Sequence, residues 1–292
     1  MLSIALTTCV LCSQTEVTTP KYDSKLDFHF VHQFESSIDN GGDVDLTSYG
    51  AEFRYDIAIT NSDDLQFKFQ LQRDQWNFSG TSGLGLDNPW ETINTIDLGL
   101  TWTHHYSKST QWFFSGLGRT SYEEDASTGT VYGGAVGFIH SFSSDLTFGL
   151  GAGVIQQELD DVRWFPVFVL DWKIGHNLTL TSDISTRFGG RTGVELVWAP
   201  NKKWTLGAGY AYSYSRFRLD DSGFAPNGAG EATSSPLTFR ATYHSSPTFD
   251  ITFLGGIILN GRIEVIDQQK ATVARQDYES AGSIGILGQI RF

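Results

Sequence analysis

The sequence predicts an all-β fold: a transmembrane antiparallel up-and-down β-barrel of about 14 strands, with about 12 as the alternative count. Three observations predict it. Apolar and polar residues alternate with period two from about Lys25 to the last residue. The connections between the alternating segments are sorted by length, long and short in turn. Aromatic residues gather at the ends of these segments.

Composition supports a folded chain in an apolar setting. Of 292 residues, 18% are charged and 14% are aromatic, whereas charged residues make up roughly 25% of an average soluble protein. The chain has 33 acidic and 20 basic residues and a net charge of −13. This acidic balance excludes a nucleic-acid partner, which requires a basic surface. The chain lacks a run of about 18 apolar residues, so a helical membrane span is not expected.

The first residues are read as a targeting segment. Leu2 to Ser13 is a short apolar stretch without charge, and the first basic residue is Lys21. We predict a signal-peptide remnant over residues 1–14, a short N-terminal segment over 15–24 and the barrel domain over 25–292; a native N-terminal segment is the alternative. Cys9 and Cys12 lie in the apolar stretch without the second cysteine pair of a zinc site. Lipid attachment at Cys9 stays open.

Period-two alternation places one set of side chains on each face of a strand. In the segment Tyr49 to Ile57, for example, the odd-numbered residues are apolar and Glu52, Arg54 and Asp56 face the other side. Strands are expected to begin near Leu26, Thr47, Leu65, Thr95, Gln111, Val131, Leu146, Trp164, Leu178, Gly193, Trp204, Leu237, Thr248 and Gly282.

The connections separate into two kinds. The short ones are rich in Asn, Asp, Ser, Gly and Pro, which form turns; they are Thr60 to Asp64, Tyr106 to Thr110, Ser143 to Asp145, Gly175 to Asn177, Ala199 to Lys203 and Ser245 to Pro247. The long ones are Glu35 to Asp45, Asn77 to Thr92, Tyr122 to Thr130, Arg218 to Ser234 and Asn260 to Glu279, with Gly189 to Thr192 as a short exception. Barrels of bacterial outer membranes have short periplasmic turns and longer external loops.

Aromatic rings prefer the membrane–water boundary. Pairs flank the short turns: Trp102 with Trp112, Phe142 with Phe148, Trp198 with Trp204, and Tyr243 with Phe249. We interpret them as the periplasmic girdle. A looser external girdle is expected from Tyr49, Trp76, Tyr132, Trp164, Phe188 and Tyr214. Rings that merely fill a soluble β core are the alternative.

The last strand carries Ile284, Ile286, Gly288, Ile290 and the terminal Phe292. A final aromatic after alternating apolar residues resembles the signal that the outer-membrane barrel-insertion machinery reads. We therefore expect this machinery and outer-membrane lipid as partners, a monomeric barrel, and the outer membrane of a Gram-negative bacterium as its location. An open strand edge is untenable in lipid, so the barrel must be closed.

The inward face predicted by the alternation contains charges of both signs in near balance. The candidates that line the lumen are Glu52, Arg54, Asp56, Lys68, Asp97, Arg119, Asp171, Lys173, Asp183, Arg187, Glu195, Arg240, Asp250 and Arg291. One interpretation is a polar passage for small solutes. The other is an interior network that plugs the barrel, because charges in a confined site must pair.

Catalytic and metal chemistry is not indicated. His104 and His105 are adjacent, so they point to opposite faces of a strand and cannot chelate together. A membrane esterase would need an outward histidine, for which His32, His104 and His140 are candidates, but no local motif identifies a serine partner. Acidic pairs such as Asp220-Asp221 match no calcium loop. We predict no enzyme, no cofactor and no metal.

The C-terminal part, roughly residues 160–292, resembles an uncharacterised family of Gram-negative outer-membrane β-barrel proteins of unknown function. The residues that carry the resemblance are Pro166, Asp171-Trp172, Arg216 to Asp220, Gly228, Gly230-Glu231, Pro236 and Arg291-Phe292. It implies location and fold, because this family has no assigned activity. The N-terminal half shares only the general barrel pattern.

The leading functional hypothesis is a porin-like barrel for passive passage or binding of small solutes through a polar lumen. The alternatives are a structural or surface-interaction barrel that acts through its long external loops, and a lipid-modifying outer-membrane enzyme.

Overall fold

A computed structural model describes residues 24–80, 84, 88–124, 126, 129–182, 192–223 and 225–292, with only the backbone described for 160 and 161. The predicted signal remnant, Cys9 and Cys12 lie outside these residues. Asp183, Arg187 and Phe188 lie outside them as well.

Fifteen strands and one short 3-10 helix are present in the described part of the chain. The strands are β1 Ser24–Ser37, β2 Asp43–Ala58, β3 Asp63–Ser79, β4 Thr92–His105, β5 Thr110–Glu123, β6 Thr130–Ser141, β7 Leu146–Gln157, β8 Asp161–Gly175, β9 Leu178–Thr181, β10 Thr192–Asn201, β11 Trp204–Arg218, β12 Ala229–Ser246, β13 Phe249–Ile266, β14 Thr272–Tyr278 and β15 Ala281–Arg291. The helix, η1, is Glu158–Asp160. In the described ranges no helix is long and apolar enough to cross a membrane.

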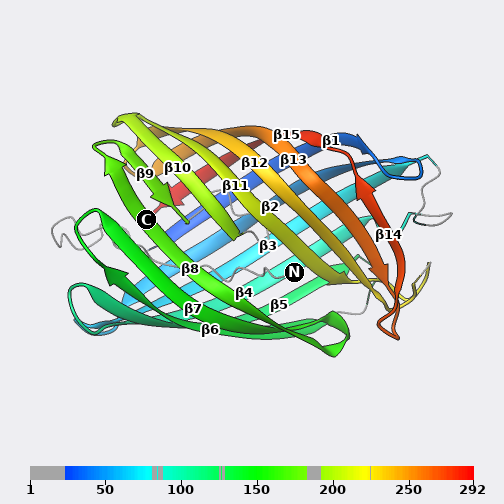
Figure 1. Ribbon diagram of the computed structural model, residues 1–292, viewed down its shortest axis with the longest axis horizontal. Coiled ribbons are helices and arrows are strands. Elements are labelled where there is room, and N and C mark those ends of the chain that lie inside the picture. Colours follow the sequence, from blue (N-terminus) through cyan, green and yellow to red (C-terminus); the bar gives the residue numbers. More distant parts are fainter. Residues whose placement is uncertain are drawn as a thin grey trace.

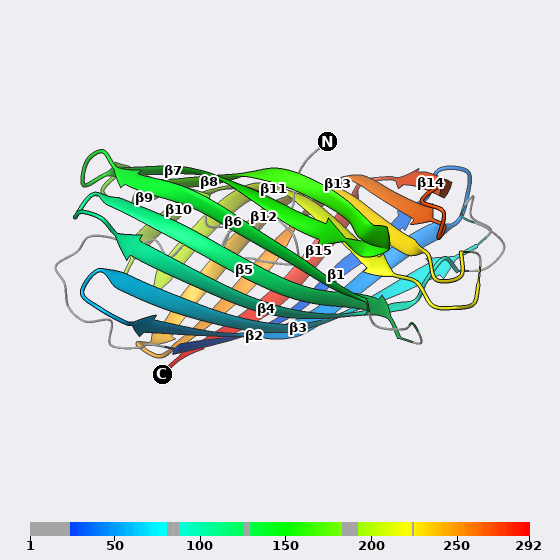
Figure 2. The ribbon, with the colours of Figure 1, turned by 90° about the horizontal axis from the view of Figure 1, so that it is seen from below.

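The strands form a closed antiparallel barrel (Figures 1 and 2). Each strand from β1 to β13 pairs with its chain neighbours, and β1 also pairs with β15 over Lys25 to Gln33, which closes the ring. β14 and β15 pair with successive parts of β13 and together make one wall strand, so the barrel has 14 strands. Closure leaves no sheet edge in lipid, as the sequence predicts.

The two ends of the barrel differ. The short turns and the C terminus lie at one end, which we call the turn end, and β14 lies at the other, the loop end (Figure 1). The outer surface is apolar: Leu98, Phe253 and Ile284 are about half exposed. Near the turn end, rings stack in pairs, with 5.4 Å between the ring centroids of Trp102 and Phe114 and 5.0 Å between those of Trp204 and Tyr243. This surface has the apolar band and aromatic girdle of a transmembrane barrel.

Two of the predicted long loops are strand in part. β12 begins at Ala229, within the segment expected to run as a loop to Ser234. β13 continues to Ile266 and β14 follows from Thr272, within the segment expected to be a loop from Asn260 to Glu279. The expectation was wrong because strands that leave the lipid no longer need an apolar outer face, so charged and amide residues there looked like loop. The connections that remain are residues 219–228 and 267–271, with positive φ at Asn227 and Lys270.

At the loop end, β11 stays paired with β12 up to Arg218 and also reaches β5. Its pairing with β10 ends at Tyr212, and Arg218 forms a parallel bridge with Tyr122 of β5. Tyr214 is 4% exposed and packs against the inner faces of β5 to β8. Tyr214 was expected in the external girdle, and the approach of β11 to β5 puts it inside instead.

Neighbouring residues of β3 test which side chains face the lipid and which face the lumen. Leu71 is 43% exposed on the outer face and about halfway along the strand, so Leu71→Arg should lower the free energy of unfolding by about 2–4 kcal/mol because it places a cation in mid-bilayer lipid. Urea titration of the barrel in lipid vesicles measures this loss.

Gln72 is the matched control at the same depth. Its amide donates to the Asp74 carboxylate inside the barrel, so an arginine there gains a partner, and Gln72→Arg should cost less than about 1 kcal/mol. Equal losses for the two variants would contradict the assigned faces.

Candidate functional site

A charged vestibule occupies the lumen at the turn end. Its volume is about 340 Å³, and its lining includes Glu52, Arg54, Arg240, Asp250 and Arg291 of the predicted lumen residues. Alternation and closure of the barrel bring these side chains together, since they face inward from β2, β12, β13 and β15. Lys25, Asp27 and His244 complete the charged lining.

The vestibule charges are paired. Arg54 and Lys68 both bind Glu52, at 2.6 and 2.8 Å. Arg291 binds Asp250, and the Nδ1 atom of His244 lies 2.8 Å from the other oxygen of that carboxylate. Pairing explains how so many charges fit in a confined interior at near-neutral total charge.

Two bidentate pairs join different strands: one links the neighbours β4 and β5, and the other spans β11 to link β10 and β12. Arg119 of β5 donates to both oxygens of Asp97 on β4 at 2.6 and 2.7 Å. Arg240 of β12 donates to both oxygens of Glu195 on β10 at 2.7 and 3.1 Å. Fork-to-carboxylate geometry is the strongest common arrangement of such groups. These pairs stiffen the wall of the lumen.

The other predicted lumen residues lie apart from this network. Asp56 accepts a hydrogen bond from Gln66 at 2.5 Å near the β2–β3 turn. Lys173 reaches the carbonyl of Ser144 at the β7–β8 side of the turn end. Asp171, two residues before it on β8, lies opposite Thr147 and Thr181. Asp183 and Arg187 lie outside the described residues.

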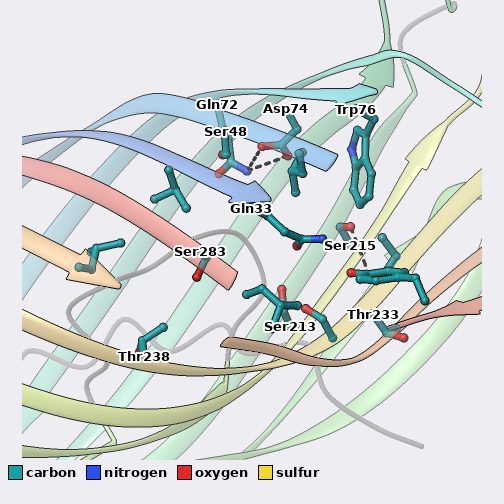
Figure 3. Close-up of a pocket in the computed structure, with 17 residues that line it drawn as sticks. Gln33, Ser48, Gln72, Asp74, Trp76, Ser213, Ser215, Thr233, Thr238 and Ser283 are labelled. Atoms are coloured by element: carbon teal, nitrogen blue, oxygen red, sulfur yellow. Dashed lines mark hydrogen bonds between the residues drawn. The ribbon is translucent and has the colours of Figure 1, made fainter. Parts of the chain in front are cut away.

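A second cavity, which we call the middle cavity, lies farther toward the loop end (Figure 3). Its volume is about 100 Å³, and Gln33, Ser48, Gln72 and Asp74 line one wall. The amide of Gln70, which lines the vestibule, donates to Gln72 at 3.1 Å, so the two cavities are neighbours along the lumen. Sequence reasoning missed this cavity. Gln72 and Asp74 are an even number of residues from Lys68 on β3, so alternation places them on the same inward face.

An aromatic barrier closes the loop-end side of the middle cavity. We give this name to Trp76, Phe78, Trp90 and Phe217, which pack edge to face or stacked with ring centroids 4.8–6.2 Å apart. Trp90 is fully buried and Phe217 is 1% exposed. Trp76 was expected in the external girdle; it faces inward because it shares the parity of Gln72 and Asp74.

Beyond the barrier lies an acidic mouth. This cavity of about 420 Å³ is lined by Glu91, Glu123, Glu124 and Asp220. Leu219 and Ala225 belong both to its lining and to the apolar cluster of the barrier, so the barrier separates the mouth from the middle cavity. Burial raises the pKa of the Glu123 carboxyl, although backbone N–H groups of Asp220 and Glu91 donate to it.

The lumen is polar on one side only. The inner faces of β5 to β8 carry Phe113, Ile139, Phe165 and Val169, all at most 5% exposed. Phe113 covers Gly137, where an added Cβ would overlap its ring. The glycines of β6 and β7 thus leave room for inward rings, and this side of the barrel is packed rather than wet.

The histidines are engaged in turns and strand pairs. Among the outward candidates, His32 bonds Thr47 at 3.0 Å and His140 bonds Thr110 at 2.8 Å. His104 bonds Asp63 at 2.9 Å, and the hydroxyls of Thr60 and Ser62 donate to the same carboxylate. These contacts fix the β3–β4 end of the barrel. In the part of the chain that the structure describes, no three His, Cys, Asp or Glu residues are placed to hold a metal.

Comparison with known proteins supports the fold. No family model matches the chain, and no curated protein matches it in sequence. The resemblance of residues 160–292 to an uncharacterised barrel family therefore stays a prediction. A mutant of the TodX monoaromatic hydrocarbon channel aligns over 94% of this chain and 91% of its own, at 10% identity and a TM-score of 0.55. An outer membrane channel from Pseudomonas putida F1 aligns over 95% of this chain and 100% of its own, at 8% identity and a TM-score of 0.50. The fold is thus that of outer-membrane barrels.

The Asp97–Arg119 pair yields a stability prediction. The Asp97 side chain is 3% exposed, so Asp97→Leu should cost about 3–5 kcal/mol by leaving Arg119 buried and unpaired. The double variant Asp97→Leu/Arg119→Met should cost less than the single one, because no buried charge remains. Urea unfolding of the three proteins measures this, and additive losses would contradict it.

The turn carboxylate Asp63 yields a pH prediction. Hydrogen bonds from Thr60 and His104 lower its pKa to about 2. A lowered pKa stabilises the fold above the ordinary carboxyl pKa of about 4, and this contribution is lost as the pH falls toward 2. Asp63→Asn should therefore lose less stability than the native protein on acidification across this window.

Thr60→Ala, which removes the leading hydrogen bond to Asp63, should shift the acid response in the same direction. Guanidinium unfolding curves at several pH values give the measurement. Parallel acid losses in all three proteins would show that Asp63 has no part.

Proposed function

We propose that this barrel is a channel protein of a Gram-negative outer membrane that passes small solutes by passive diffusion. The observation that carries the proposal is the line of three cavities along one lumen: the acidic mouth, the middle cavity and the charged vestibule. A barrel built only to hold its own shape has no need of successive interior cavities. The short turns of the turn end then face the periplasm.

Charge favours uncharged solutes. The vestibule charges are paired with one another, so they offer little net attraction to an ion. Glu91, Glu123, Glu124 and Asp220 at the mouth repel anions. A small neutral molecule meets neither obstacle.

The aromatic barrier makes passage selective. It lies between the acidic mouth and the middle cavity. Its central rings, Trp90 and Phe217, are at most 1% exposed. Solutes therefore pass only when these rings move. We expect low ionic conductance compared with a wide porin, and solute flux limited by this step.

Two solved structures with this fold are described as channels. One is described as a monoaromatic hydrocarbon channel and the other as an outer membrane channel. At 8–10% identity they support the fold, and the channel role of the present chain is our inference from its own cavities.

The surface-interaction alternative is less well supported. Leu84 and Trp90 of the β3–β4 connection, and Leu219 and Ala225 of the β11–β12 connection, pack inward on the barrier. These connections cover the lumen. The enzyme alternative has its histidines bonded to threonine and aspartate at strand ends, which fits a structural role.

The C-terminal residue fits the proposed recognition by the insertion machinery. Phe292 is 59% exposed at the turn end, and its N–H donates to the Ser24 carbonyl beside the closing β1–β15 pair. The aromatic ring is thus presented where an assembling barrel closes. The insertion machinery, the lipid partner and the monomeric state remain parts of the proposal.

Truncation of the barrier tests the channel proposal. Trp90→Ala and Phe217→Ala should each raise solute flux in a liposome-swelling assay and single-channel conductance in planar bilayers, by several-fold, because each removes a buried ring. Trp164→Ala is the control, since Trp164 is an outward ring and 67% exposed; it should leave both readouts unchanged. A folded native barrel and both barrier variants without flux would refute the channel.

A further inference from the structure

Two buried polar groups of the middle cavity, one on Gln33 and one on Ser48, have no partner among the described residues. Gln33 is 5% and Ser48 is 6% exposed. Among the described protein atoms, neither the Gln33 amide nitrogen nor the Ser48 hydroxyl makes a hydrogen bond. Burial of such groups is unfavourable unless something pairs with them. They point to an occupant of the cavity.

The register places these two groups on one wall. Ser48 of β2 lies opposite Val31 of β1 and Asp74 of β3. Gln33 lies one step farther toward the loop end, opposite Leu46 and Ser283. Figure 3 shows both side chains at the cavity. A single polar group of a ligand can therefore meet both.

Gln33 is held with its amide nitrogen available. Tyr278 lines the same cavity, and the amide nitrogen of Gln33 makes no hydrogen bond to any described protein atom. The amide N–H is thus a donor. The Ser48 hydroxyl can donate or accept.

The rest of the lining is mixed, and hydroxyl groups stand beside apolar side chains at Ser213, Ser215, Thr233, Ser234, Thr238 and Ser283. Trp76, Leu254 and Ile258 surround the polar wall. The volume of about 100 Å³ is somewhat smaller than the roughly 150 Å³ cavity that accommodates benzene. A single ring therefore fits once the lining side chains shift slightly, and a larger occupant would require larger movements.

The charge of the lining excludes anions. Asp74 is the one charged residue among the described residues that line the cavity. Its carboxylate accepts from the Gln72 amide at 2.8 and 2.9 Å. An anionic solute would meet this carboxylate without a compensating cation.

We infer that the middle cavity is a binding site for a small uncharged molecule, up to a single ring in size, with one hydroxyl or carbonyl group that pairs with Ser48 and Gln33. The inference rests on the proposed function, since it names the solute class of the same passage. The apolar part lies against Trp76, and the polar group satisfies the two side chains that the protein leaves unpaired.

The test compares three fluorinated single-ring ligands on the folded full-length barrel in detergent, by fluorine NMR. 4-Fluorophenol should bind saturably, fluorobenzene about tenfold more weakly, and the anion 4-fluorobenzoate not measurably. Equal affinity for 4-fluorophenol and fluorobenzene would overturn the inference. This series uses the native protein alone and does not depend on any variant folding.

Variants locate the site. Ser48→Ala and Gln33→Leu should each weaken 4-fluorophenol binding about three- to tenfold, with fluorobenzene binding unchanged. Ser115→Ala is the control, since Ser115 bonds Thr101 at 2.8 Å on β4 and β5 and does not line the cavity. Heat-dependent gel mobility verifies folding. An unchanged preference for the phenol in Ser48→Ala would overturn the inference.

Flux separates the inference from the proposed function. Saturable 4-fluorophenol binding without solute flux through the native protein or the barrier variants would refute the channel and leave the binding site in place. Flux without saturable, hydroxyl-dependent binding would retain the channel and refute the site.

Discussion

The whole molecule depends on the requirement that every backbone N–H and C=O in lipid has a partner. The β1–β15 pairing over Lys25 to Gln33 meets this requirement by making the sheet a ring. Once the ring is closed, each side chain of a membrane-spanning strand faces either the lipid or the lumen. The apolar exterior, the existence of an interior and the placement of the paired charges all follow from that closure.

The interior then has to be filled. Fourteen strands enclose more space than side chains on two faces fill alone, and this chain uses three solutions. Glu52 and Asp97 pair with cations on the neighbouring strand, and Glu195 pairs with a cation two strands away. Phe113 and Phe165 pack over glycines of β6 and β7. β11 reaches β5 at the loop end and brings Tyr214 into the apolar cluster of β5 to β8, so that side of the lumen is packed with apolar side chains.

The sequence could predict which face of each strand a side chain occupies, because successive side chains alternate between the two faces. It placed Glu52, Arg54 and Arg240 on one face, and the same rule applied further along β3 would have placed Trp76 inside with Lys68. The position of Tyr214 could not be predicted, because it results from a contact between Arg218 and Tyr122 that are far apart in the chain. The strands beyond the lipid were missed because their outer faces are solvated and lose the apolar alternation.

The passage opens at the part whose side chains move at the lowest free-energy cost. The two parts to compare are the charged vestibule and the aromatic barrier. Opening the vestibule would break bidentate ion pairs such as Arg240–Glu195, and leaving one buried charge without its partner costs about 3–5 kcal/mol. Moving one ring of the barrier into water costs about 1.5–3 kcal/mol of lost burial. Trp90 has a further advantage, since its indole nitrogen is buried without a partner among the described atoms and would gain a hydrogen bond to water on exposure. The barrier at the loop end is thus the part that yields first, and the charged vestibule is the fixed frame against which it moves.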